Sequence, residues 1–182
     1  MKAKAELRQR ARQQAQIQKE HEQTADELAP DTAIAQQYFN KILRDGVFTP
    51  HQASIGTPEF DDRQRQNLCD LLAYTLDGRR GKKDFVLELM AGDGRNYPTL
   101  RRKFKHVEML EQAEAMTTYY QSDIVKHTVS IQDFKWPPHV YDTIVGSWVL
   151  GYLNKGDRED TITRIHRALM EDGYHVVFEA VT

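Results

Sequence analysis

The sequence predicts a doubly wound α/β fold built on a mostly parallel sheet, and three observations support this. From Phe85 onward, short apolar runs alternate with polar or helix-forming stretches. Strands that alternate with helices pair in parallel through right-handed crossovers. The stretch "LMAGDGRN" follows the first apolar run, at the carboxyl end of a strand, where such folds bind ligands. The length of 182 residues allows one core of ordinary size plus an appendage.

The elements of this core follow from the spacing of its apolar residues. Strands and helices are expected to alternate along it. The expected strands cover residues 85–90, 106–110, 128–131, 141–149 and 175–181. The expected helices cover residues 97–104, 113–122 and 158–170.

Two helical segments are expected ahead of the core, which divides the chain into three parts. Residues 1–30 form a polar basic helical arm, whose first 20 residues carry six Lys or Arg against two Glu. Because this arm has almost no apolar residues, it has no face to bury against its own core. Residues 31–84 repeat apolar residues at helical spacing and are expected to pack on the core, residues 85–182.

Composition excludes several classes of protein. The chain has no apolar run of the length that spans a bilayer, so membrane insertion is not expected. Cys69 is the single cysteine, which excludes an internal disulfide framework and favours a reducing compartment. No cluster of His and Cys residues has the spacing of a metal site. We expect an intracellular protein, cytoplasmic or mitochondrial.

The turn after the first strand is the candidate ligand site. Gly92 and Gly94 allow the backbone to turn tightly and to approach a ligand closely. Glu88 lies inside the strand, and Glu111 ends the second strand, where a carboxylate can accept both hydroxyls of a ribose. A plain strand-to-helix turn and a surface glutamate are the alternatives that these residues leave open.

Four stretches together carry a family resemblance. They are "VLELMAGDGR", "VEMLEQ", "SIQDFKWPPHVYDTIVGSWVLGYL" and "ALMEDGYHVVFEA". In this order they resemble the motifs of class I S-adenosylmethionine-dependent methyltransferases, and most closely those of the eukaryotic protein α-N-terminal methyltransferases. The resemblance covers about residues 85–182 and implies a Rossmann-like core.

The resemblance implies an S-adenosylmethionine site with a role for each matching residue. Gly92 and Gly94 would face the amino-acid moiety, and Arg95 would pair with its carboxylate, as a guanidinium does with two parallel hydrogen bonds. Glu111 would hold the ribose. Ile131 and Gln132 match the pair that flanks the adenine. Ser147 stands where the family usually has glutamine, and Trp148, beside it, is expected to be a core aromatic.

Three substitutions depart from the family's pattern. Met90 stands at the first glycine of the turn, so a long side chain takes space normally left for the cofactor. Tyr152 stands where these enzymes have a histidine, and Val181 where they have an asparagine. A tyrosine with its ordinary pKa near 10 is a poor base at neutral pH, and valine accepts no proton. We therefore expect no catalytic residue, with Tyr152 as the weak candidate.

The end of the core also departs from the family. Class I methyltransferases continue the sheet with a further helix and two antiparallel strands, whereas this sequence ends at Thr182. The resemblance then implies that residues 175–181 form an edge strand, and exposed edges invite another chain. Either the 182 residues are a fragment of a longer product, or a partner covers that edge. We expect partner proteins to bind this edge and the helix of residues 1–28.

Three readings of function remain open on the sequence. In the first, a catalytically degenerate methyltransferase fold serves as a structural subunit of a larger intracellular assembly. In the second, an active methyltransferase acts on a protein α-amine. In the third, the basic arm makes the protein an accessory factor bound to RNA.

Overall fold

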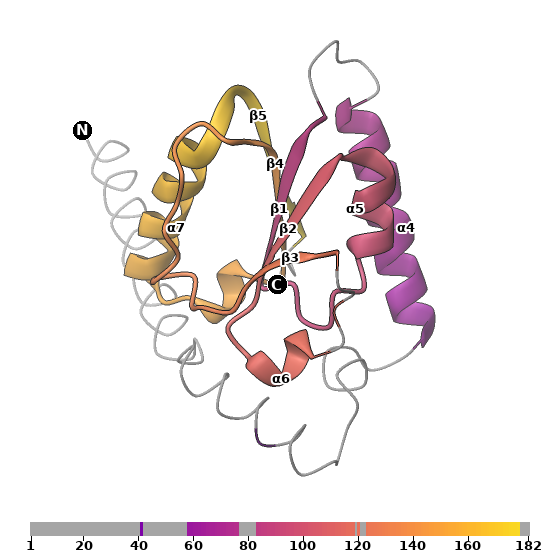
Figure 1. The fold of residues 1–182 in the computed structure, drawn as a ribbon, viewed down its shortest axis with the longest axis horizontal. Coiled ribbons are helices and arrows are strands. Elements are labelled where there is room, and N and C mark those ends of the chain that lie inside the picture. The colour runs from indigo at the N-terminus through magenta and orange to yellow at the C-terminus, as the bar shows by residue number, and fades with distance from the viewer. Residues whose placement is uncertain (1–40, 42–57, 77–82, 119, 121–122, 179–182) are drawn as a thin grey trace, which may run out of the picture.

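The computed structural model describes residues 41, 58–76, 83–118, 120 and 123–178. A five-stranded parallel sheet lies between α4 and α5 on one face and α7 on the other (Figure 1). Its order, β3-β2-β1-β4-β5, confirms the predicted fold. The strands are β1 (Phe85–Leu89), β2 (His106–Leu110), β3 (Val125–His127), β4 (Tyr141–Ser147) and β5 (Leu169–Phe178). The helices are α4 (Pro58–Leu76), α5 (Tyr97–Lys103), α6 (Glu114–Thr117), the 3-10 helix η1 (Leu150–Tyr152) and α7 (Lys155–Ala168).

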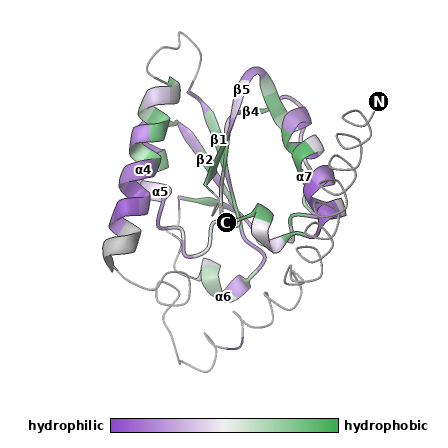
Figure 2. Ribbon diagram, turned by 180° about the vertical axis from the view of Figure 1, so that it is seen from behind, coloured by the Kyte–Doolittle hydropathy of each residue, from purple (hydrophilic) through white to green (hydrophobic). Residues whose placement is uncertain are grey.

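The core has two apolar layers, one on each face of the sheet. Successive side chains of a strand point to opposite faces, so Val86 joins the layer under α4 and α5 while Leu87 and Leu89 join the layer under α7. Figure 2 shows hydrophobic residues along the central strands and hydrophilic residues along much of α4 and α7. β1 is therefore buried on both faces, as the middle strand of a parallel sheet must be.

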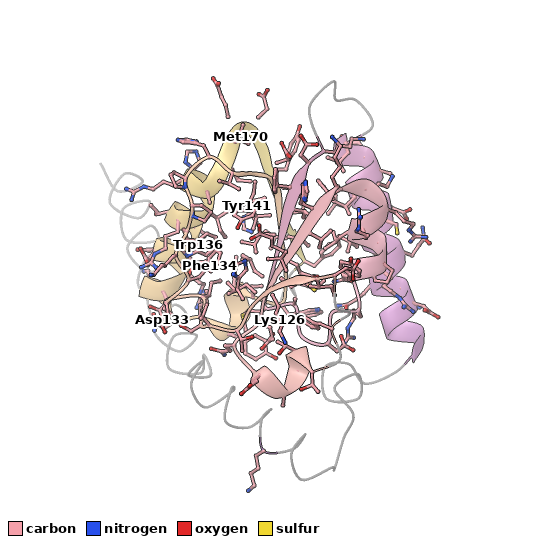
Figure 3. The ribbon with its side chains drawn as sticks, in the orientation of Figure 1. Lys126, Asp133, Phe134, Trp136, Tyr141 and Met170 are labelled. Carbon is pink, nitrogen blue, oxygen red and sulfur yellow. The ribbon has the colours of Figure 1, made fainter. Side chains whose placement is uncertain are left out.

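Each covering helix buries one stripe of side chains. In α4, Leu68, Leu72 and Leu76 recur every four residues and are at most 3% exposed. In α7, Thr161, Ile165 and Ala168 form the buried stripe, and Phe134, Trp136 and Tyr141 lie between this helix and the sheet (Figure 3). These stripes fix both helices against the sheet and so position the loops at its ends.

The third strand and the helix before it differ from their predicted bounds. The third strand is β3, residues 125–127, and not residues 128–131, because a turn in which the Ser130 oxygens accept hydrogen bonds from the backbone N–H groups of Asp133 and Phe134 ends the extended chain. The helix expected at residues 113–122 is the shorter α6. It ends at Thr117 because the chain then carries Tyr120 back to the turn after β1.

The last strand begins earlier than predicted, at Leu169 instead of residue 175. Tyr141 pairs with Leu169, but Thr143, two residues on, pairs with Tyr174, so the residues between the predicted helix and the predicted strand form a bulge inside β5. A Cβ on Gly173 would lie 2.9 Å from the Met170 carbonyl oxygen, so only glycine fits there. The bulge keeps β5 in register along the rest of β4.

The remaining predictions on the chain's ends lie outside the described residues. These are the arm of residues 1–30, most of the segment before α4, and Val181 in the last predicted strand. None of the helices in the described ranges is long and apolar enough to cross a membrane.

Candidate functional site

The turn between β1 and α5, residues 90–96, has the backbone of a ligand cradle. Met90, Gly92 and Gly94 have φ values of +49°, +58° and +76°. Glycine adopts this left-handed region without cost, whereas other residues lose about 1–2 kcal/mol there. Met90 therefore holds a conformation that suits glycine, the residue that the resemblance places at this position.

Glu88 lies beneath this turn in a fully buried position. Its side chain is 2% exposed, and its Oε1 accepts a hydrogen bond of 2.6 Å from Asn96 Nδ2. Its Oε2 is buried without a hydrogen-bond partner among the described residues. Burial raises the pKa of Glu88 to about 8, against a smaller lowering by the bond from Asn96. The carboxyl group is therefore protonated at neutral pH.

Glu111, at the end of β2, holds the turn through both carboxylate oxygens. Its Oε2 accepts from the Gly92 N–H at 2.9 Å, and its Oε1 accepts from the Ala113 N–H at 2.8 Å. Burial raises its pKa, and these backbone hydrogen bonds oppose the rise. The carboxylate expected to hold a ribose instead joins the β1 turn to the loop after β2.

Arg95 already has a carboxylate partner from its own turn. Its Nε donates to Asp93 Oδ1 at 2.8 Å, and the two side chains are 9% and 10% exposed. The guanidinium expected to pair with the cofactor's carboxylate is thus engaged by Asp93. Desolvated ion pairs of this kind are costly to break, because each charge is left buried.

The pocket beside the turn is small and apolar. Its lining combines the turn with the carboxyl ends of β2 and β3: Met90, Leu110, Gln112, Val129 and Ile131. It has room for about one water molecule. Ile131, expected to flank an adenine, is in this lining together with Met90. The amide of Gln132 instead donates to Asp157 Oδ2 at 3.0 Å, at the start of α7.

Tyr120 belongs to the site, although sequence reasoning missed it. Its hydroxyl donates to the Gly92 carbonyl oxygen at 2.9 Å, and a Cβ on Gly94 would lie 3.0 Å from its ring. Burial, and then the charges of Glu111, Glu88 and Asp93, raise the pKa of Tyr120, so it remains a donor. No sequence pattern identifies this residue, because its contact with Gly92 joins two segments that are 28 residues apart in the chain.

The residues after β4 lie at the same end of the sheet. Tyr152 is half-buried in η1. Ser147 ends β4, and its neighbour Trp148 is 39% exposed with a φ of +61°, so the prediction of a core aromatic is wrong. The strand ends here, and the Trp148 N–H reaches the Phe178 carbonyl oxygen of β5. Within the described ranges, no group of His, Cys, Asp and Glu could hold a metal ion.

This architecture is that of the class I S-adenosylmethionine-dependent methyltransferases, a Rossmann-like fold. Solved structures carry the comparison, since no family model and no curated protein matches the chain. A methyltransferase of Leishmania major superposes with a TM-score of 0.66 at 22% identity, over 80% of this chain and 59% of its own length. The N-methyltransferase NodS of Bradyrhizobium japonicum, solved with S-adenosylhomocysteine, gives a TM-score of 0.60 at 20% identity, over 78% of this chain and 70% of its own length.

A third similar structure is phosphoethanolamine N-methyltransferase 1 of Haemonchus contortus, with a TM-score of 0.62 at 16% identity. It is matched over 80% of this chain and 32% of its own length. This chain thus spans about three fifths of the Leishmania protein and a third of the Haemonchus one. At these identities the likeness is one of fold.

The backbone of the turn fits S-adenosylmethionine, but the side chains as they lie do not. The left-handed turn and the buried Glu88 oxygen are features of a polar ligand site. Against them, the pocket that Met90 lines has room for about one water molecule, and Asp93 holds Arg95. In this cradle Glu111 and the Arg95 Nε already bond to protein groups, whereas Glu88 Oε2 has no hydrogen-bond partner among the described residues.

Proposed function

We propose that this protein is a catalytically degenerate member of the methyltransferase fold that serves as a structural subunit of a larger assembly. One observation carries the proposal: Met90 lines a pocket with room for about one water molecule, beside Ile131, the residue that the resemblance assigns to the adenine. The contacts of Glu111 with Gly92 and of Asp93 with Arg95 support it, because they satisfy the groups that a cofactor would need.

We also propose that the protein acts by binding partner proteins. Without a bound methyl donor, the fold contributes surfaces instead of chemistry. The β5 side of the sheet and the helix of residues 1–28 are the proposed contact surfaces for partner proteins, since a strand edge offers unpaired backbone groups.

The test is calorimetric titration of the full chain with S-adenosylmethionine, using wild type, Met90→Gly and Met90→Leu. We expect no heat of binding from the wild type or from Met90→Leu, which keeps the bulk of the side chain. Met90→Gly relieves a positive φ and opens the pocket, so it is the variant expected to gain binding. Binding by the wild type at micromolar concentration would overturn the proposal.

An active methyltransferase acting on a protein α-amine is the second candidate, and Glu88 favours it. A buried carboxyl oxygen without a partner costs about 1–3 kcal/mol, a cost that an unused site has no reason to keep. If the wild type binds S-adenosylmethionine, transfer of a labelled methyl group to peptides with a free amino terminus is the next measurement. Methylation of such peptides would establish this function.

A further inference from the structure

A basic hollow lies at the opposite end of the sheet from the glycine turn. Its charged lining comes from the residues just before β1 and from the end of α5 with the connection to β2: Lys83, Asp84, Arg101, Arg102, Lys103 and Lys105. The turn follows the carboxyl end of β1, whereas the hollow adjoins its amino end. A strand of five residues is roughly 16 Å long, so the two sites are separate.

The hollow is strongly positive although the chain as a whole carries a formal charge of −2. Five cations surround one carboxylate, and that carboxylate is itself paired, since Lys105 Nζ lies 2.7 Å from Asp84 Oδ1. Arg102 and Lys105 are exposed. Three consecutive cations in the last turn of α5 also face the negative end of that helix, which stabilises them in place.

The side chains of the lining indicate which kind of polyanion, an acidic protein or a nucleic acid, the hollow fits. The core of a protein–protein interface is apolar and depleted in lysine, but the one apolar residue of the hollow, Phe104, is 2% exposed and offers little surface to a protein partner. Interfaces with nucleic acids are much more positively charged. The lining holds no exposed aromatic side chain on which a base could stack, so contacts would go to phosphates.

We propose that this hollow binds the sugar–phosphate backbone of a nucleic acid, without reading its sequence. Lysine and arginine side chains that contact phosphates release counterions, so the affinity depends steeply on salt. The proposal concerns a surface distant from the glycine turn and does not depend on whether a cofactor binds there.

The test measures binding of the full chain to a labelled single-stranded RNA of mixed sequence, by fluorescence anisotropy over a series of salt concentrations. The hollow is changed in Arg102→Glu/Lys105→Glu. The matched control is Arg63→Glu/Lys126→Glu, the same change of charge at two exposed positions on α4 and β3. Circular dichroism and thermal melting establish that all three proteins are folded.

We expect the wild type to bind with an affinity that falls as salt rises. The hollow variant should lose about tenfold or more in affinity, and its salt slope should fall by about two, one for each phosphate contact removed. The affinity of the control should stay within about twofold of that of the wild type, since salt screens charges that lie far from the bound RNA.

Three outcomes would overturn the proposal. If the hollow variant binds as the wild type does, the basic residues of the arm carry the affinity and the hollow does not. An equal loss of affinity in the control variant would mean that RNA binding depends on the net charge of the protein and not on the hollow. Displacement of the RNA by polyglutamate at an equal concentration of charges would mean that the hollow takes acidic protein segments instead.

Discussion

Glu88 and Glu108 lie on neighbouring strands, and their pKa values shift in opposite directions. Glu88 points into the layer beneath α5 and has one carboxyl oxygen without a partner in the described part of the chain, so burial raises its pKa to about 8. Glu108 accepts hydrogen bonds from His127 and from the Tyr141 hydroxyl, which lower its pKa against a smaller effect of burial. Burial dominates at Glu88, whereas the hydrogen bond from His127 dominates at Glu108, so the two carboxyl groups favour opposite protonation states.

Glu88 should make the folded protein less stable as pH rises. Between its usual value of 4.5 and about 8, the folded state keeps a proton that the unfolded state releases, so each pH unit costs up to about 1.4 kcal/mol. Glu88→Gln keeps the shape of the protonated acid and removes this dependence. As pH rises across this window, we expect the melting temperature of Glu88→Gln to increase relative to that of the wild type. Parallel curves of melting temperature against pH would contradict the raised pKa.

Glu108 should produce the opposite dependence. Its lowered pKa adds stability that is complete above the unfolded value of 4.5 and is lost as pH falls through the folded value. Glu108→Gln should therefore destabilise the protein at neutral pH, with a deficit that shrinks in acid. Denaturant midpoints measured from acid to neutral pH test this, with exposed Glu159→Gln as the control. A deficit independent of pH would mean that packing, not charge, is lost.

At the scale of the elements, α7 begins with a side-chain cap. Asn154 Oδ1 accepts from the Asp157 N–H at 2.9 Å, and its Nδ2 donates to Asp157 Oδ2 at 3.1 Å. Asp157 in turn accepts from the Gln132 amide, so the cap also fixes the loop that carries Ile131. The start of this helix and one wall of the pocket are thus held by a single carboxylate.

Loss of this cap should destabilise the protein by about 1 kcal/mol, because Asn154→Ala leaves the first-turn N–H of Asp157 without its acceptor. Asn154→Ser can still cap the helix and should recover most of the loss. Urea denaturation of the three proteins gives the comparison through midpoint and slope. Equal midpoints for Asn154→Ala and wild type would show that solvent replaces the cap without cost.

The elements with a clear period were predictable from the sequence, and those set by distant contacts were not. β2 has the predicted bounds, and β1 and α5 each end one residue early. The apolar residues Val129 and Ile131 suggested a strand, but the turn at Ser130 places them in a loop. Likewise, α6 ends early because Tyr120 packs on a glycine 26 positions before it. Such contacts join segments that no local pattern connects.

The candidate site shows the same division. The positions of Gly92, Gly94 and Glu111 at strand ends follow from the alternation of strands and helices. The hydrogen-bond partners of the polar groups could not be predicted from the sequence, because Asp93 and Tyr120 reach their partners only once the turn is folded. Sequence motifs thus located the cradle, and only the structure showed that Glu111 and Arg95 already bond within the protein while Glu88 Oε2 has no partner among the described residues.

At the scale of the whole molecule, the sequence predicts that the basic arm contributes little to the hydrophobic core. Among the described residues, those from α4 onward form two apolar layers, with Leu72, Leu87 and Ile144 fully buried. Residues 1–28 hold few large apolar residues and cannot bury a comparable surface. The arm is therefore expected to act in binding and not in folding.

Deletion of residues 1–28 should leave a cooperative melting transition within a few degrees of that of the full chain, since little buried apolar area is removed. The matched control is Leu72→Ala, which empties space in the layer under α4 and should cost about 2–5 kcal/mol. Differential scanning calorimetry of the three proteins gives the transition temperature and its enthalpy. If the deletion abolishes the transition as a core substitution would, the arm is part of the folding unit, and its proposed role as a docking helix fails.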